Sequence, residues 1–301
     1  MGKQQTDKRV RFDFEVDFTN GGGIRGQDFR LDIDGDGISD EALADYIVRD
    51  MRLLMVGGVR ILNKEIIAEE HKRTPLPRAG GPNVGLVDVS HDVEDGMVTY
   101  KGLPAPIVCD YLSREESRGH YAEGTEFQIG KIEMVANTGT YVDAPFHRYP
   151  DGKDLSGLPL PSLADLDAVV VRNDPARRQV DTGAFAGLDV EGKAVLVHTG
   201  WDRFWRTDEY FVGHPFLTGE AAEHLVEAGA ALVGIDSLNI DDTDDGSRPV
   251  HTALLGEEIP IVEHMRGLEN LPESGARFFA VPVKVRGFGT FPVRAFAKVE
   301  R

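Results

Sequence analysis

The chain has 301 residues, of which 41% are hydrophobic and 28% are charged, a globular composition that excludes wholesale disorder. The formal net charge of -18 argues against nucleic acid and anionic membranes as partners, because a field of that sign repels phosphate. Cys109 is the only cysteine, so no internal disulfide can form, and no apolar run of about eighteen residues occurs. We therefore expect a cytoplasmic protein.

Residues 1–80 predict a small strand-rich extension. Phe12, Phe14 and Val16 alternate with acidic residues, the period-two pattern of a half-buried strand. Residues 21–26 match the dinucleotide fingerprint G-x-G-x-x-G, but a second strand follows instead of the helix that the fingerprint requires. We interpret the glycines as a hairpin connection, and we expect the apolar face to pack on the main domain or on a partner subunit.

An acidic stretch at residues 32–40 resembles the start of a calcium loop, but Leu43 stands where the closing glutamate belongs. A simpler interpretation takes Ser39 as the N-cap of a helix that runs towards Leu54. Residues 59–67 then predict a pair of strands that turns at Asn63.

Residues 69–83 have the charged and then Pro- and Gly-rich composition of a linker, which predicts a domain boundary near residue 80 and a main domain over 84–301. In the main domain, apolar runs indicate strands and periodic stretches indicate helices. The strands are expected at 168–171, 194–197 and 231–235, and the helices at 219–228 and near 263–271. This mixture predicts an α/β or α+β domain with a mixed sheet.

Residues 131–150 begin as a strand buried on one face and end in a loop dense in polar groups. The groups that can bind or transfer protons are Asn137, Thr140, Tyr141, Asp143 and His147. The stretch fits either a functional loop held by a rigid scaffold or a plain surface turn. Two further candidates, His251 and Glu263, follow downstream. With Asp143 and His147 they supply two imidazoles and two carboxylates, a set suited to zinc, manganese or iron.

At residues 137–147 the chain resembles the signature H-x-G-T-H-x-D-x-P-x-H of the cyclase family, to which bacterial kynurenine formamidases and isatin hydrolase belong. Further similarity lies at residues 87–91, 199–201, 234–236 and 292–295, so that the resemblance extends over about residues 84–300. It implies a swivelling β/β/α fold, homodimers or homotetramers, and a metal site that activates water against an amide, cyclic amide or lactone carbonyl of a small substrate.

Carried over by position, the resemblance makes Asp143, His251 and Glu263 metal ligands and His147 the general base. Asn137 and Tyr141 replace the two signature histidines, so we expect one divalent ion, manganese, iron or zinc, instead of a pair.

Three functions stay open at this point. The first is a mononuclear hydrolase, similar to an arylformamidase, in which Asn137 or Tyr141 orients the substrate. The second is a metal-free lyase, dehydratase or cyclase that uses His147 and Tyr141 as acid and base. The third is a non-catalytic homologue. Thr140 and Trp201 are candidates for substrate binding, and the acidic residues 241–245 form either a solvated turn or a support for the site.

Overall fold

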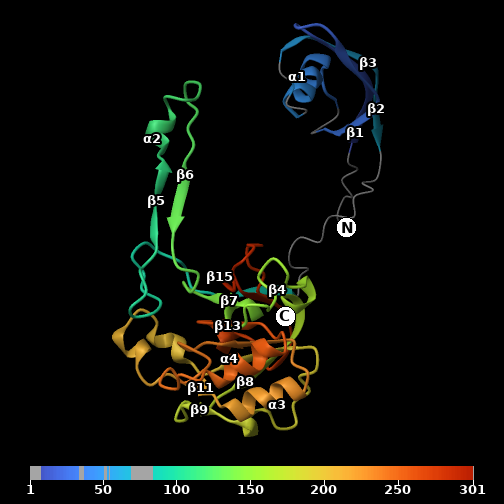
Figure 1. The fold of residues 1–301 in the computed structure, drawn as a ribbon. Coiled ribbons are helices and arrows are strands. Elements are labelled where there is room, and N and C mark those ends of the chain that lie inside the picture. Colours follow the sequence, from blue (N-terminus) through green and yellow to red (C-terminus); the bar gives the residue numbers. More distant parts are fainter. Residues whose placement is uncertain (1–7, 34–36, 51–52, 54, 69–83, 301) are drawn as a thin grey trace. The chain divides into compact units, whose positions relative to one another are not determined.

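The computed structural model describes residues 8–33, 37–50, 53, 55–68 and 84–300 (Figure 1). The chain divides into two compact units, Met1–Arg78 and Ala79–Arg301. The linker predicted for residues 69–83 lies outside the described residues.

The first unit is a three-stranded antiparallel sheet in the order β2-β1-β3 with one helix. Its elements are β1 (Lys8–Phe18), β2 (Gly23–Asp32), α1 (Asp40–Asp50) and β3 (Val56–Ala68). The predicted apolar face of β1 is buried, with Phe12 and Phe14 at most 2% exposed. Leu43 and Ile47 of α1 belong to the same core, so the unit covers this face with its own helix. The Oγ of Ser39 accepts a hydrogen bond from the N–H of Ala42 at 3.1 Å, as predicted for the N-cap.

The strand pair predicted for residues 59–67 is wrong, because β3 continues through Asn63 as one strand. Asn63 has a φ of 50°, a left-handed conformation that asparagine tolerates, and its Nδ2 donates to Asp13 at 2.7 Å. The pairing of β1 with β3 shifts register beside Asp13. The turn-like residue therefore makes a bulge and not a reversal of the chain.

The second unit is built on a nine-stranded mixed sheet in the order β15-β7-β13-β12-β10-β8-β14-β16-β4. The four strands from β13 to β8 are parallel, and the outer strands are antiparallel to their neighbours. In sheet order the strands are β15 (Thr290–Pro292), β7 (Tyr141–Asp143), β13 (Ile261–Glu263), β12 (Leu232–Ile235), β10 (Ala194–His198), β8 (Ala164–Arg172), β14 (Ser274–Phe279), β16 (Phe296–Glu300) and β4 (Val84–Asp88). The prediction of a mixed α/β fold is confirmed.

Few helices accompany this sheet. The α-helices are α2 (Arg114–Ser117), α3 (Gly219–Glu227) and α4 (Pro249–Gly256). Two short strands, β9 (Gln179–Val180) and β11 (Phe216–Leu217), form a small parallel sheet of their own. The 3-10 turns are η1 (Pro145–His147), η2 (Leu160–Ser162), η3 (Thr182–Phe185), η4 (Trp201–Phe204), η5 (Asp208–Phe211) and η6 (Leu268–Asn270).

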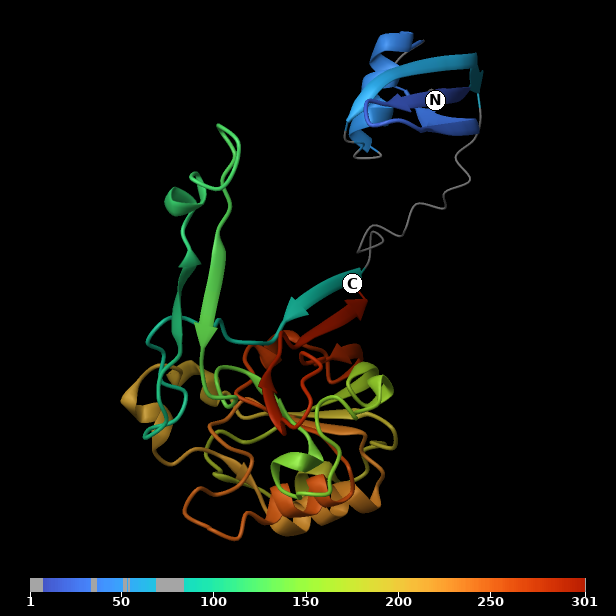
Figure 2. The same ribbon diagram turned by 45° about the horizontal axis from the view of Figure 1, so that its top comes forward.

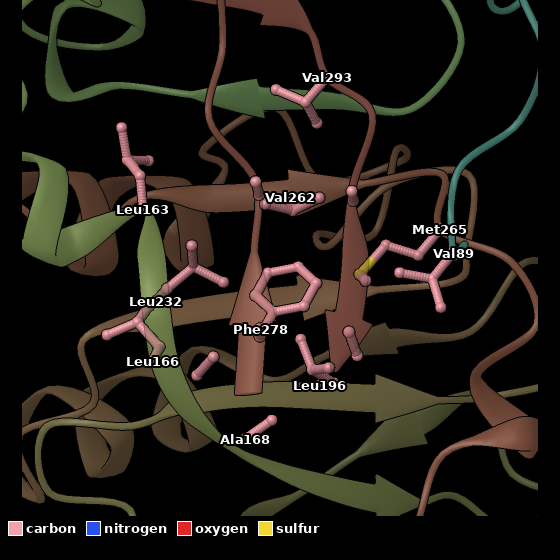
Figure 3. Close-up of a cluster of buried hydrophobic side chains, with 14 of the residues drawn as sticks. Val89, Leu163, Leu166, Ala168, Leu196, Leu232, Val262, Met265, Phe278 and Val293 are labelled. Atoms are coloured by element: carbon pink, nitrogen blue, oxygen red, sulfur yellow. The ribbon is translucent and has the colours of Figure 1, made fainter. Parts of the chain in front are cut away.

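The central strands are buried on both faces, which explains their continuous apolar sequence. On β10, Leu196 belongs to one core and Val195 to the other. The first core gathers side chains of the sheet, such as Phe278 of β14, and of the segments that follow its strands, such as Met265 after β13 (Figure 3). The second core lies between the sheet and the helices α3 and α4, and it includes Leu254 of α4. The sheet therefore gives α4 a fixed position beside β13 and β7.

Two predictions for this unit are wrong. The helix expected near residues 263–271 is absent from this described stretch, where β13 ends at Glu263 and only the short turn η6 follows. The left-handed φ of 65° at Gly267 is incompatible with a continuous helix there.

The strand expected to start at residue 131 is likewise not buried on one face. It is the end of β6 (Ile129–Glu133), which pairs with β5 (Ile107–Leu112) in a hairpin that projects from the sheet (Figures 1 and 2). Every residue of β6 is exposed. The apolar alternation in this stretch therefore does not report a core within the chain.

Candidate active site

Strand register brings the predicted residues of β7 and β13 together. Tyr141 pairs with Glu263 across these strands, and Asp143 pairs with Thr290 of β15 on the other side of β7. Val142, between Tyr141 and Asp143, packs in the core on the far face of the sheet. Because side chains alternate along a strand, Tyr141 and Asp143 point to the face that carries α4.

Helix α4 brings His251 to the same place, and Asp241 orients it. The carboxylate of Asp241 accepts hydrogen bonds from the backbone N–H groups of Val250 at 2.7 Å and His251 at 3.1 Å. It also accepts one from the His251 ring nitrogen Nδ1 at 2.6 Å. This leaves Nε2 of His251 facing Asp143 Oδ2 at 3.7 Å and Glu263 Oε1 at 3.8 Å. A carboxylate that fixes an imidazole in this way is typical of metal-binding histidines.

The surroundings of His251 carry an excess of buried negative charge. Asp143, Asp241 and Glu263 are at most 1% exposed. Asp143 Oδ2 has no hydrogen-bond partner among the described residues. Buried carboxylates are costly unless a cation compensates them, and one imidazolium cannot balance three. The arrangement fits a bound cation next to Asp143 and His251.

The pKa values in this cluster follow from the same charges. Burial would lower the pKa of His251, but its contacts with Asp143 and Asp241 and the charge of Glu263 raise it to about 10. Burial raises the pKa of Glu263 to about 7, against the opposing charge of His251. The cluster is therefore one that holds a positive charge strongly, either as a proton or as a cation.

His147 stands at the outer edge of this cluster, with its side chain 36% exposed. The hydroxyl of Thr290 donates to Asp143 Oδ1, so it can only accept from Nδ1 of His147, at 2.9 Å. Nδ1 therefore carries the proton and Nε2 is left as an acceptor. Gly289 permits this approach, because a Cβ there would lie 2.4 Å from the backbone nitrogen of His147.

Asp143, His147 and His251 each offer a ligand atom, and these three atoms lie within 4.8 Å of one another. Glu263, the third predicted ligand, is not part of this group, although it faces the same imidazole. Its Oε2 accepts from the hydroxyl of Tyr141 at 2.6 Å, and its Oε1 accepts from the backbone of Ile240 at 2.6 Å. Oε2 also accepts from Nδ2 of Asn239 at 3.4 Å, whereas Oε1 keeps a second lone pair with which Glu263 can bind an ion.

The cluster opens into a cavity of about 310 Å³. The lining residues are Tyr100, Leu103, Asn137, Tyr141, His147, Arg148, Asn239, Arg248, His251 and Glu263. The structure thus brings Asn137 and Tyr141, which stand in place of the signature histidines, to the same cavity as His147, His251 and Glu263.

Thr140 and Trp201, predicted to bind substrate, do not line this cavity. The hydroxyl of Thr140 donates to the carbonyl of His264 at 2.5 Å and accepts from the backbone of His91 at 2.9 Å. The indole of Trp201 donates to the carbonyl of Tyr210 at 3.0 Å. Both side chains are engaged in holding neighbouring segments together.

Sequence reasoning missed the cavity residues Tyr100, Asn239, Arg148 and Arg248, which no local pattern marks. Of the two interpretations of residues 241–245, support of the site holds for Asp241, whereas Asp244 and Asp245 are exposed.

Comparison with known proteins shows the family to which the chain belongs. A family model described as "Putative cyclase" matches residues 87–242, more than half of the chain. The chain belongs to this family. A kynurenine formamidase of Salinibacter ruber is 27% identical over 214 residues, which cover 70% of this chain and 96% of that relative. The resemblance inferred from the signature and its flanking segments is thereby confirmed.

Solved structures of other proteins share the fold of this chain. An isatin hydrolase bound to the product analogue thioisatinate aligns with a TM-score of 0.62 and 20% identity over 73% of this chain and 94% of that one. A potential metal-dependent hydrolase with cyclase activity aligns with a TM-score of 0.60 and 25% identity over 72% of this chain and 99% of that one. The predictions of the fold and of a hydrolase are confirmed. Within the described residues, no helix has the length and apolarity needed to cross a membrane.

Proposed function

We propose that this cyclase-family hydrolase is metal-dependent and cleaves an amide, cyclic amide or lactone bond in a small aromatic or cyclic substrate. Relatives named kynurenine formamidase and isatin hydrolase support the substrate class. The observation that best supports a bound metal ion is the buried Oδ2 of Asp143. This oxygen has no hydrogen-bond partner among the described residues and faces Nε2 of His251 at 3.7 Å.

In this proposal Asp143, His251 and Glu263 would hold one divalent ion, manganese, iron or zinc. Such an ion supplies Lewis acidity towards the carbonyl and lowers the pKa of water. Two carboxylates and one imidazole form a donor set that each of these metals accepts. Asn137 and Tyr141 position the substrate in the cavity that they line.

In this proposal His147 transfers the proton. Its Nδ1–H donates to Thr290, which leaves Nε2 free to take a proton from the attacking water. Asp143 Oδ1, at 3.8 Å from Nδ1, stabilises the resulting imidazolium. The same nitrogen then returns the proton to the departing nitrogen or oxygen of the substrate, so a single group serves both halves of the reaction.

The metal-free alternative would require Tyr141 as a base or acid beside His147. Tyr141 is buried and donates its hydroxyl hydrogen to Glu263 at 2.6 Å. Burial and the charge of Glu263 raise the pKa of the phenol well above its ordinary value. The phenolate is therefore disfavoured, and the hydrolase is the better supported proposal.

The test is turnover of an aryl formamide, a cyclic amide and an aryl lactone by the purified protein, with and without a strong chelator. We expect hydrolysis of at least one of them, loss of activity on chelation, and recovery on adding back a single metal. Unchanged hydrolysis in the chelator would refute metal dependence. Failure on all three substrates would refute the proposed bond class.

We also propose that the chain forms a cytoplasmic homodimer or homotetramer. Support comes from the β5–β6 hairpin, on which Tyr111 is 74%, Ile132 58% and Phe127 52% exposed. An isolated two-stranded hairpin is marginally stable in water, so a second copy would stabilise this one. Ile132→Asp should shift the molar mass measured by light scattering towards the monomer. An unchanged mass would exclude the hairpin from the interface.

A further inference from the structure

The mouth of the cavity carries positive charge in an otherwise acidic protein. Acidic residues outnumber lysine and arginine by 51 to 33, yet Arg148 and Arg248 both line the cavity. Among the described residues, neither guanidinium has a carboxylate within 4.0 Å. A guanidinium prefers a planar anion as its partner, so two of them at one opening can bind one.

Arg248 is held in an unusual backbone conformation at the start of α4. Its φ of 50° and ψ of 60° are left-handed, which is uncommon for a residue other than glycine and occurs preferentially at functional sites. Its Nη1 donates to the backbone carbonyl of Asp242 at 2.8 Å. The carboxylate of Asp242 lies 3.6 Å from Arg178 instead. Arg248 therefore keeps most of its donors for another partner.

Arg148 follows His147 directly in the chain, and its side chain extends to α4. Its Nε lies 3.4 Å from Thr252 Oγ1, and its guanidinium lies 5.3 Å from the ring centroid of Tyr149. The ring of Tyr149 is itself fixed, because its hydroxyl donates to the carbonyl of Thr252 at 2.8 Å. Arg148 thus contacts the first turn of α4, and Arg248 is the residue that precedes this helix, so both belong to the surroundings of His251.

We infer that the substrate carries an anionic group, a carboxylate or a phosphate, which Arg148 and Arg248 bind at the mouth while its carbonyl lies against His251 and Asp143. This inference rests on the proposed hydrolase, whose substrate class it narrows. A cavity of about 310 Å³ is small for a ligand site, so the anion and the carbonyl belong to one compact molecule.

The experiment compares three aryl formamides that differ in one ring substituent: formanilide, 3-formamidobenzoate and 3-formamidophenylphosphonate. For each we would measure kcat/KM and, by calorimetry on the metal-loaded protein, the Kd. Variants are Arg148→Gln and Arg248→Gln, with Arg148→Lys and Arg248→Lys to retain charge. The matched control is Arg177→Gln, which removes an exposed guanidinium that pairs with Asp181 at 3.6 Å.

The wild type should prefer an anionic formamide to formanilide, and each glutamine variant should lower that preference by roughly tenfold, the scale of a lost charge-assisted hydrogen bond. The lysine variants should retain part of it, and Arg177→Gln should leave it unchanged. Of 3-formamidobenzoate and 3-formamidophenylphosphonate, the substrate with the higher kcat/KM identifies the anion.

Equal kcat/KM values for neutral and anionic formamides in the wild type would overturn the inference and leave the hydrolase intact. Absence of turnover would instead exclude aryl formamides as substrates and leave cyclic amides and lactones to the test of the proposed function. In that case tighter binding of the anions, lost in the glutamine variants, would still support the inference, and equal binding would overturn it. Thermal melting of each variant excludes misfolding as the cause.

Discussion

The cavity has two ends that differ in burial. At the inner end the side chain of His251 is 8% exposed, and those of Asp143 and Glu263 are at most 1% exposed. At the mouth His147 is 36% exposed, and Arg148 is exposed as well. Substitutions at the inner end should therefore reduce ion binding and the turnover of every substrate, whereas the effect of substituting the arginines at the mouth should vary with the substrate.

The largest effect should come from the inner end. His251→Ala and Asp143→Asn each remove an atom proposed to bind the ion, so we expect metal loss and a decrease in turnover of about a thousandfold or more. Elemental analysis and steady-state kinetics check this. His224→Ala, on α3 and outside the described Asp–His–His group, is the control. Full metal content in His251→Ala would rule out His251 as a ligand.

His147→Ala tests whether His147 transfers protons or binds the ion. If His147 transfers protons, turnover should fall by about a hundredfold, the usual scale for a general base, while the metal stays bound. The close grouping of His147 with Asp143 and His251 offers the opposite outcome. Loss of the ion in this variant, with retention in Glu263→Gln, would make His147 the third ligand in place of Glu263.

Metal affinity should rise with pH. In the absence of metal the pKa of His251 is raised to about 10, so at neutral pH its imidazole is protonated and the proton must leave before Nε2 binds an ion. The apparent affinity should increase by up to about tenfold per pH unit below that value. Titrations at pH 6 and pH 8 measure this. Equal affinities at the two pH values would contradict the exchange of a proton for the ion.

Asp241→Asn should have a smaller effect, because Asp241 orients His251 without facing the cavity. Weaker fixation of the imidazole should reduce metal affinity by about 10- to 100-fold. Asp245→Asn, in the same loop but exposed, is the matched control. A metal affinity equal to that of the control would show that the backbone alone positions His251.

Tyr141→Phe should have the smallest effect of the series. It removes the hydroxyl that donates to Glu263 at 2.6 Å and leaves a buried carboxylate oxygen less satisfied. We expect a loss of about 1–3 kcal/mol in the free energy of unfolding and a decrease in turnover of about tenfold. A decrease as large as that of His147→Ala would instead assign Tyr141 to proton transfer.

The contrast between the buried end and the mouth of the cavity also explains how much of the site the sequence could predict. Asp143 and His147 share one short stretch, and His251 and Glu263 matched the family by position, so the inner end could be anticipated from residue identity and order. The central strands were predictable because strands buried on both faces have continuous apolar sequence. Residues such as Thr290 and Arg248 join the site only through strand pairing and helix placement, which no local pattern reports.

Two errors in the second unit show what a local pattern leaves open. The alternation at residues 131–136 predicts contact with a core, but alternation records only that one face of a strand is apolar. In this chain β6 exposes that face on the hairpin. A helix is expected near residues 263–271, but the pairing of Glu263 with Tyr141 keeps that residue in β13, and the left-handed φ of 65° at Gly267 prevents a helix beyond it.

The central claim is that one divalent ion belongs to the buried end of the cavity. The most direct test is elemental analysis of the protein purified without added metal and without a metal-binding tag. The account predicts about one manganese, iron or zinc ion per chain, removed by His251→Ala. Two ions per chain would contradict the mononuclear site, and none, with activity retained in a strong chelator, would contradict the metal itself.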